Sequence, residues 1–149
     1  MNAVSIRKAR TADLPQIHNL VRELAIYEKA EADFTAPLAL YKDNFEKGVF
    51  DAIVAENKGK IIGMCLFYMT FSTWKGRMLY LEDFIIQQAY RRNGLGQRLF
   101  DAFLAEAKQL DCTLVKWQVL DWNTPALEFY KKNNAIIEQE WWNGKIFLK

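Results

Sequence analysis

The segment Arg91-Arg92-Asn93-Gly94-Leu95-Gly96 combines two cations with two glycines. It follows an apolar run typical of a strand and precedes a helical pattern, so it should open a helix. Glycines let a ligand come close to the backbone, and successive N–H groups at a helix N-terminus point at an anion. The segment therefore suits a pyrophosphate; the structural alternative is a basic turn in which the glycines serve only the backbone.

Two common nucleotide-binding loops do not match this segment. A dinucleotide-binding loop requires G-x-G-x-x-G, but the third position after Gly96 is Leu99. A P-loop ends in Gly-Lys-Ser or Gly-Lys-Thr, whereas Gln97 and Arg98 follow Gly96. The sequence therefore argues against both loops, and against a dinucleotide-dependent oxidoreductase.

Two adjacent acids, Glu82 and Asp83, interrupt the apolar run Leu79–Ile86. Burying carboxylates in such a run is costly without a function, although a solvated acidic pair is the structural alternative. Side chains of a strand alternate between its faces, so only one of the two acids should face a cleft. A carboxylate in that position can accept a proton.

Phe129 and Tyr130 lie on a short helix predicted over residues 125–132, with Asn123 or Thr124 as its N-cap. One of the two aromatic residues should belong to the core, and periodicity does not decide which. A tyrosine hydroxyl is protonated at neutral pH, so it is an available proton donor. The structural alternative for Asn123 and Thr124 is that they only cap this helix.

The elements that must position these residues follow from periodicity. A strand over residues 4–9 precedes a helix from its N-cap Thr11 to Glu28, and a second helix runs from after Thr35 to Gly48. Three strands are then predicted at 50–56, 61–71 and 78–86, followed by a helix after the glycine loop and a strand at 113–120. The short helix comes next, and a final hairpin has its arms at 135–141 and 145–149.

The predicted order is therefore β-α-α-β-β-β-α-β-α-β-β, a mixed α/β fold with a parallel crossover in its second half. No repeat, low-complexity tract or linker interrupts the 149 residues, so we expect one domain over 1–149.

Composition limits the classes of function. The chain is 51% hydrophobic and 26% charged with a formal net charge of +2, which does not suggest nucleic acid or a membrane as partner. No apolar run is long enough to span a membrane, and the first residues lack the apolar stretch of a secretory signal. Two cysteines and one histidine argue against a metal site and a disulfide scaffold. We expect a cytoplasmic, metal-independent protein.

The pattern R/Q-x-x-G-x-G/A, which Arg91–Gly96 meets, resembles the acyl-CoA signature of the GCN5-related N-acetyltransferases (GNAT), and the predicted order of elements looks like that fold. Arg92 stands where the closest relatives usually carry Gly. The resemblance to the diamine acetyltransferase group covers nearly the whole chain. It rests on Ser72–Arg77 with Tyr80–Asp83, on Val119–Asn123 with Phe129–Lys131, and on Arg22–Ala25 with Tyr27 and Glu28. Ser72-Thr73, where spermidine/spermine acetyltransferases usually have Asp-Pro, makes the chain look more like the thialysine N-ε-acetyltransferase branch.

The resemblance implies acetyl-CoA as cosubstrate, with its pyrophosphate on the glycine loop and its pantetheine arm in the splay between strands 79–86 and 113–120. The residues implied to bind it are Phe84, Ile85, Ile86, Arg91, Arg92, Asn93, Gly94, Leu95, Gly96, Gln97, Asn123, Thr124, Pro125 and Ala126.

The resemblance further implies direct acetyl transfer to a small primary amine. Glu82 would assist deprotonation of the amine, directly or through water, and Tyr130 would protonate the departing CoA thiolate. Implied substrate contacts are Tyr27, Glu28, Ser72, Trp74, Glu82, Asp83, Lys116, Trp117 and Gln118. Of these, Trp117 can equally belong to the core. Members of this group commonly dimerise, so the resemblance implies a homodimer that shares its substrate cleft across the interface.

Three alternatives stay open. A diamine or polyamine can be the substrate in place of a thialysine-like amino acid, or the chain can be a non-catalytic acyl-CoA-binding module. Acetylation of protein lysines or N-termini would suit an open cleft, whereas an acidic pocket lined by tryptophan favours a compact cation.

Overall fold

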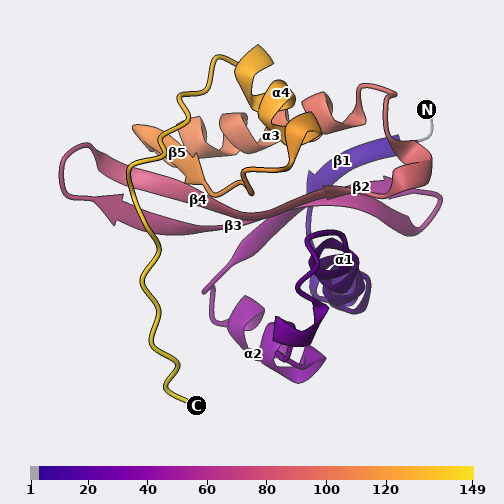
Figure 1. Cartoon of the computed structure of the whole chain (residues 1–149). Helices are drawn as coiled ribbons and strands as arrows, with labels where there is room; N and C mark the ends of the chain where they lie inside the picture. Colours follow the sequence, from indigo (N-terminus) through magenta and orange to yellow (C-terminus); the bar gives the residue numbers. More distant parts are fainter. Residues whose placement is uncertain (1–3) are drawn as a thin grey trace. The chain divides into compact units, whose positions relative to one another are not determined.

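The computed structural model describes residues 4–149, which divide into two compact units, one ending at Gln118 and the other spanning Val119–Lys149. The first unit carries a five-stranded sheet, and the second carries one helix and the C-terminal segment (Figure 1). Within residues 4–149, no helix is both long and apolar enough to cross a lipid bilayer. The prediction of a single domain over 1–149 stays a prediction.

The sheet of the first unit has its five strands in sequence order. Neighbouring strands pair antiparallel except β4 and β5, which are parallel. Its strands are β1 (Val4–Lys8), β2 (Asp51–Asn57), β3 (Lys60–Ser72), β4 (Gly76–Ile86) and β5 (Leu114–Trp117). The mixed α/β class and the parallel crossover are confirmed; β5 is shorter than the strand predicted over 113–120.

Helices cover both faces of this sheet (Figure 1). On one face lie α1 (Leu14–Tyr27) and α2 (Leu38–Glu46), and α3 (Leu95–Gln109) lies on the other. Buried leucine and isoleucine side chains of α1 pack in one cluster with Met64 of β3 and Ile85 of β4. On the opposite face Phe103 of α3 contacts Phe67 of β3 at a ring separation of 5.5 Å. Removing these side chains from water supplies the main stabilisation of the unit. Short 3-10 turns, η1 (Thr11–Asp13), η2 (Glu31–Asp33) and η3 (Gln88–Tyr90), connect the elements.

The start of α1 differs from the prediction. Thr11 was expected as its N-cap, but Thr11 lies in η1, and the N-cap residue is Asp13, whose side chain makes no hydrogen bond to the helix. Asp13 accepts the backbone N–H of Arg10 at 2.7 Å and two hydrogen bonds from the Arg7 guanidinium at 2.7 and 2.9 Å. The hydrogen bonds from Arg7 lower the pKa of the buried Asp13 carboxyl. An ion pair with Arg7 of β1 thus holds the Asp13 carboxylate at the start of α1.

The pairing of β4 is irregular at the two acids. Leu66 of β3 lies opposite Asp83, whereas the next residue, Phe67, lies opposite Leu81, so Glu82 is the extra residue of a β-bulge. On its other side, β4 pairs with β5 only over Met78–Leu81. The remainder of β4, Glu82–Ile86, has no pairing with β5, and this is the splay that the fold predicts.

The second unit contains α4 (Thr124–Lys132), close to the predicted short helix. The final hairpin predicted at 135–141 and 145–149 is wrong: residues 135–149 form neither strand nor helix. Their apolar side chains face solvent, with Trp142 94%, Ile146 88% and Leu148 92% exposed. The alternation that predicted the strands is present, but a strand needs backbone pairing with a neighbouring strand, and residues 135–149 belong to no sheet of the described chain.

Candidate active site

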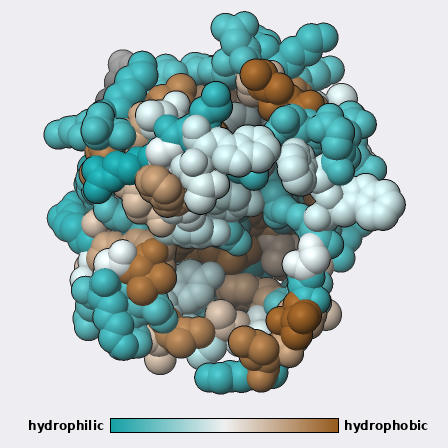
Figure 2. Space-filling view, turned by 90° about the vertical axis from the view of Figure 1, so that its left-hand side faces the viewer, coloured by the Kyte–Doolittle hydropathy of each residue, from teal (hydrophilic) through white to brown (hydrophobic). Residues whose placement is uncertain are grey.

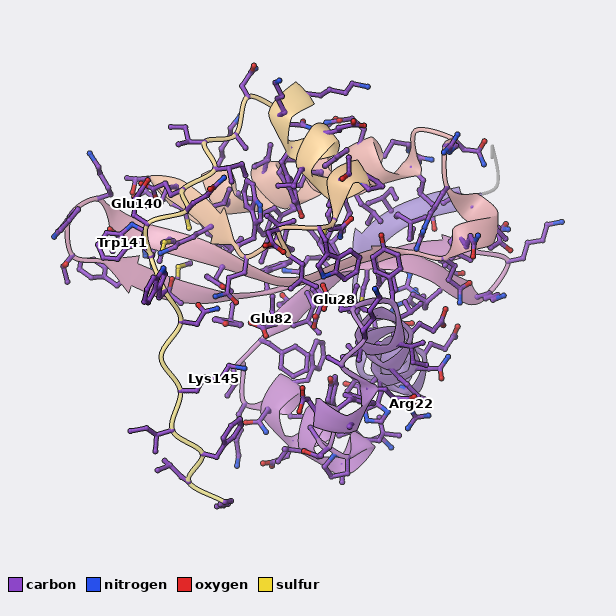
Figure 3. All side chains as sticks on the ribbon, viewed as in Figure 1. Arg22, Glu28, Glu82, Glu140, Trp141 and Lys145 are labelled. Atoms are coloured by element: carbon purple, nitrogen blue, oxygen red, sulfur yellow. The ribbon has the colours of Figure 1, made fainter. Side chains whose placement is uncertain are left out.

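Three carboxylates, Glu28, Glu82 and Asp83, form one cluster in the first unit. Glu28 follows the last residue of α1, and the two others lie on β4; Figure 3 shows Glu28 and Glu82 close to each other. The expectation that only one of the adjacent acids faces the cleft is wrong. The bulge shifts the alternation of β4 by one residue, so that Glu82 precedes the shift and Asp83 follows it on the same face.

The environment of these acids is one of uncompensated negative charge. Burial above all, and then the charges of Glu82 and Glu28, raise the pKa of Asp83 to about 7. Burial, with a smaller contribution from Glu82, also raises the pKa of Glu28. Among residues 4–149, none of the three carboxylates forms an ion pair with Lys, Arg or His. A cation bound here would relieve this repulsion, so the cluster suits an ammonium group.

Three tyrosines that the sequence analysis missed surround the cluster. Tyr68 of β3 donates its hydroxyl to Glu82 Oε1 at 2.7 Å and stacks on Tyr80 of β4. Burial and the charges of Asp83 and Glu82 raise the pKa of Tyr41, on α2, to about 12. The position of Tyr80 two residues before Glu82, on the same strand face, is the one signal that could have found it.

His18 supports this wall of the site. Its Nε2 lies 2.8 Å from the carbonyl oxygen of Ala36, and its ring contacts Tyr41 edge to face and Phe34, each at 4.9 Å between centroids. These contacts hold the connection between α1 and α2 against α1. His18 is half-buried in this packing.

The glycine loop has the backbone expected of an anion site. Gly94 is the N-cap of α3 in a left-handed conformation with φ +74°, and a Cβ atom there would meet nothing within 4 Å. The first N–H groups of an α-helix have no partner within the helix, and no acidic residue lies in the first turn of α3. Arg92 is also left-handed, with φ +67°. The loop thus has the backbone geometry of an anion site.

Arg91 joins this loop to the end of α1. Its Nε donates to the carbonyl oxygen of Ile86 at 2.9 Å, and its guanidinium lies over the Tyr27 ring at 5.6 Å. A hollow of about 350 Å³ lies beside this contact, and Gln87 donates to Glu23 at 3.1 Å in its wall. It is lined by Glu23, Ile26, Tyr27, Ile85, Ile86, Gln87, Gln88 and Arg91. The structure thus brings predicted cofactor and substrate residues together around one hollow.

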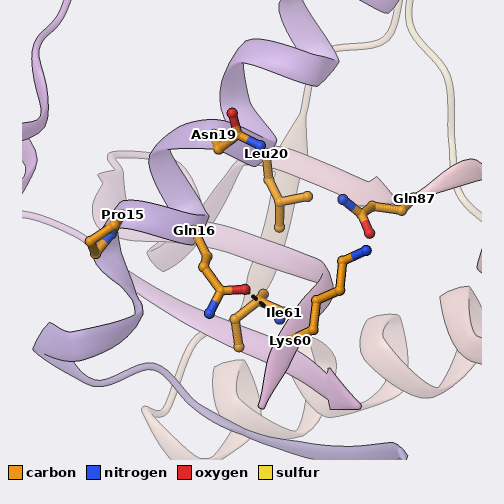
Figure 4. A pocket seen from close by; sticks show the side chains of 7 residues that line it. All are labelled: Pro15, Gln16, Asn19, Leu20, Lys60, Ile61 and Gln87. Carbon is orange, nitrogen blue, oxygen red and sulfur yellow. Dashed lines mark hydrogen bonds between the residues drawn. The ribbon is translucent and has the colours of Figure 1, made fainter. Parts of the chain in front are cut away.

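A second hollow of about 310 Å³ lies between the start of α1 and the start of β3 (Figure 4). In its wall, the Gln16 side chain accepts the backbone N–H of Ile61 at 2.8 Å. None of the predicted site residues lines it. Among residues 4–149, no group of three or more His, Cys, Asp or Glu side chains is arranged to hold a metal ion.

Two predicted substrate contacts lie away from the carboxylates. Ser72 ends β3, and Trp74 lies in the following turn with 83% of its surface exposed. At about 3.3 Å per residue, the run from Gly76 to Glu82 along β4 is about 20 Å long. Within one chain, Ser72 and Trp74 are therefore not part of the carboxylate cluster.

The predicted contacts on β5 and just after it divide between the two faces of the sheet. Trp117 packs edge to face on Phe100 of α3 at 5.8 Å, which favours the core role that the sequence left open. Because strand residues alternate, Lys116 points to the opposite face, the face that α1 and α2 cover. Gln118 follows β5 directly.

The second unit holds the other predicted cofactor and catalytic residues. The Asn123 side chain accepts the N–H of Ala126 at 3.3 Å, so Asn123 is the N-cap of α4, and Pro125 occupies its first turn. Tyr130 is the buried residue of α4, and its ring contacts that of Phe129 at 5.6 Å.

Comparison with known proteins gives consistent matches. A family model described as "Acetyltransferase (GNAT) family" matches residues 14–135. A thialysine N-epsilon-acetyltransferase of Bos taurus is 35% identical, over 96% of this chain and 91% of that protein. A spermidine/spermine N(1)-acetyltransferase-like protein 1 of Homo sapiens is 30% identical over 91% of this chain, but over 21% of that longer protein.

Solved structures show the same fold. An aminoglycoside acetyltransferase from an uncultured soil metagenomic sample, crystallised with trehalose, superposes with a TM-score of 0.83. The match covers 99% of this chain and 98% of that chain at 21% identity. At this identity the likeness concerns the fold alone.

Proposed function

Because this chain belongs to the acetyltransferase (GNAT) family, and is therefore an acetyl-CoA-dependent N-acyltransferase, we propose that it acetylates a small primary amine, with a thialysine-like amino acid favoured. The observation that carries the proposal is the cluster of Glu28, Glu82 and Asp83, which has no cationic partner within residues 4–149 and lies where β4 leaves β5. A protein that only binds acyl-CoA has no need for such a cluster.

The reaction requires removal of a proton before transfer. An alkylamine with a pKa near 10.4 is less than about 0.1% neutral at pH 7. Glu82 accepts one ammonium proton, directly or through water, and the neutral nitrogen forms the new C–N bond as the C–S bond breaks. Tyr130 donates its hydroxyl proton to the departing sulfur. The acylated nitrogen then loses its second proton to solvent, from which Tyr130 is reprotonated, and Glu82 releases the first proton to solvent. Acetyl-CoA supplies the activated acetyl group.

The glycine loop supports the proposed binding of the cosubstrate. The N–H groups at the start of α3 and the side chain of Arg92 would hold the pyrophosphate, and the open edge of β4 over Phe84–Ile86 would hydrogen-bond the pantetheine arm. Asn123–Ala126 would complete the contacts from the second unit.

We also propose a homodimer. The support is the C-terminal segment 135–149, whose apolar side chains are open to solvent, and Figure 2 shows apolar groups exposed among hydrophilic ones on one face of the molecule. If copies share a cleft, Ser72 and Trp74 of a partner copy would reach the carboxylates that they do not reach in their own chain. Because Cys65 and Cys112 are free thiols, we place the protein in the reducing cytoplasm.

A diamine or polyamine is the second candidate substrate. Three acids that lack a cationic neighbour suit two ammonium groups, and they offer no obvious partner for the carboxylate of an amino acid. The human relative is named as a spermidine/spermine acetyltransferase-like protein, which supports a polyamine as the second candidate.

Release of free CoA thiol from acetyl-CoA tests the function with thialysine, lysine, ornithine, putrescine, spermidine and a lysine-containing peptide. We expect thialysine to give the highest kcat/KM. Preference for putrescine or spermidine would establish the second candidate instead. Binding of acetyl-CoA without reaction of any amine would overturn the proposal in favour of a non-catalytic binding module.

A further inference from the structure

We propose that Tyr68 is a positioning residue for Glu82: it holds one carboxylate oxygen so that the other faces the substrate ammonium as a charged proton acceptor. The inference rests on the role proposed above for Glu82. The proposal adds a residue of β3 to the reaction. The other proposed groups of the first unit lie at the end of α1 and on β4.

The register of the sheet brings the two side chains together. Tyr68 lies opposite Tyr80 in the antiparallel pair of β3 and β4, and their rings stack at 5.4 Å with an interplanar angle of 20°. Glu82 is two residues further along β4, on the same face and at the bulge. Stacking on Tyr80 fixes the Tyr68 ring, and the hydroxyl then reaches Glu82 Oε1 at 2.7 Å.

This hydrogen bond distinguishes Glu82 from the other two acids. Within residues 4–149, Glu82 accepts it at Oε1 and has no other hydrogen bond, so Oε2 is open to a ligand. No hydrogen bond reaches the carboxylates of Glu28 or Asp83 from this part of the chain. Glu82 is an exposed side chain, and such a side chain loses its rotamer freedom only when a partner holds it.

The bond also opposes the repulsion within the cluster. Glu28 at the end of α1 and Asp83 on β4 disfavour a third negative charge nearby, whereas a hydrogen bond donated to a carboxylate favours its charged form. Burial and the neighbouring Glu82 carboxylate raise the pKa of Tyr68, so its hydroxyl stays protonated and donates. The remaining groups that face the cluster, Tyr41 of α2 and Tyr80 of β4, are neutral tyrosines with raised pKa values.

Tyr68→Phe tests the proposal, because it removes the hydroxyl that reaches Glu82 and keeps the ring that stacks on Tyr80. We expect Tyr68→Phe to lower kcat/KM for the amine about ten-fold, the scale of a lost hydrogen bond to a charged group. The loss should fall on kcat, and the KM for acetyl-CoA should not change. Tyr90→Phe, which removes a hydroxyl outside the cluster, is the control and should keep kcat/KM unchanged. An equal loss in both variants would overturn the proposal.

A double-mutant cycle with Glu82→Gln separates positioning from packing. If Tyr68 acts through Glu82, Tyr68→Phe has no further effect on kcat/KM in the Glu82→Gln background. An equal loss in both backgrounds would overturn the proposal. If Glu82→Gln alone leaves activity unchanged, the role proposed for Glu82 fails. If Glu82→Gln abolishes activity while Tyr68→Phe leaves kcat/KM unchanged, only the inference about Tyr68 fails.

Discussion

At the scale of single residues, adjacent acids on one strand differ because their immediate partners differ. Glu82 accepts a hydrogen bond from Tyr68, whereas Asp83 is more buried and has no donor within residues 4–149. Environments that set neighbouring carboxyl groups apart are typical of sites that move protons. Clustered carboxylates that have no bound cation repel one another and lower the stability of the folded protein, and this loss of stability can be measured.

Asp83→Asn should stabilise the protein at alkaline pH. The pKa of Asp83 is about 7 in the folded protein and near 4 in an unfolded chain, so the folded state keeps a proton that the unfolded state releases between these values. Stability therefore falls as pH rises from about 4 to 7 and stays at the lower value above that window. We expect a gain on the order of 2 kcal/mol at pH 8 and almost none at pH 4.

Thermal unfolding followed at both pH values checks this expectation, with Asp43→Asn, in an exposed pair with Lys47, as the control. The Asp83→Asn variant should also have a higher KM for the amine, because it has lost a charge. Destabilisation at pH 8 would contradict the argument.

Tyr130→Phe removes the proposed proton donor and keeps the ring that is buried on α4. We expect kcat to fall about a hundred-fold, the scale of a lost general acid, while the Kd for acetyl-CoA stays within about two-fold. Turnover assays and calorimetric titration with acetyl-CoA measure the two quantities separately. An equal loss of turnover and affinity would make Tyr130 a structural residue.

At the scale of elements, a bulge and an unpaired strand end create the site. The bulge at Glu82 directs two consecutive acids to one face, and the short β5 leaves the last part of β4 with an open edge. The loop that follows then starts α3 at Gly94, without an acidic residue in the first turn. The proposed binding of the cosubstrate therefore depends on where these elements end.

Gly94→Val tests the loop against a control with the same backbone. Gly94 and Gly48 have φ of +74° and +73°, and a Cβ atom at either would meet nothing within 4 Å. Both valine variants should therefore lose similar stability, at least about 1 kcal/mol, from the left-handed conformation. We expect only Gly94→Val to lose acetyl-CoA binding in calorimetric titration, because its side chain occupies the space in front of the α3 amides. Intact binding would refute the assignment of the phosphate loop.

At the scale of the whole molecule, the exposed C-terminal segment is the feature that a single chain does not explain. Isolated extended segments with exposed large apolar side chains gain stability by pairing with another surface. In the proposed dimer each copy supplies such a segment, so the association is reciprocal and closes on itself.

Light scattering coupled to size-exclusion chromatography measures the proposed association. The unsubstituted chain should have twice the mass of one copy, and Ile146→Asp with Leu148→Asp should shift it to monomers. Val49→Asp, at a position that is 55% exposed on the first unit, should leave the mass unchanged. An unsubstituted chain that is monomeric at tens of micromolar would contradict the proposed dimer.

The sequence by itself determined the elements of residues 4–132 and the loop Arg91–Gly96, because helical periodicity, strand patterns and turn glycines are properties of neighbouring residues. Only the tertiary structure decided the rest, because it depends on register between segments far apart in the chain. The bulge that turns Glu82 and Asp83 to one face exists only in the pairing of β3 with β4, and the same pairing brings Tyr68 to Glu82. The predicted final hairpin failed for the same reason: a strand pattern over residues 135–149 forms a strand only where a partner is present.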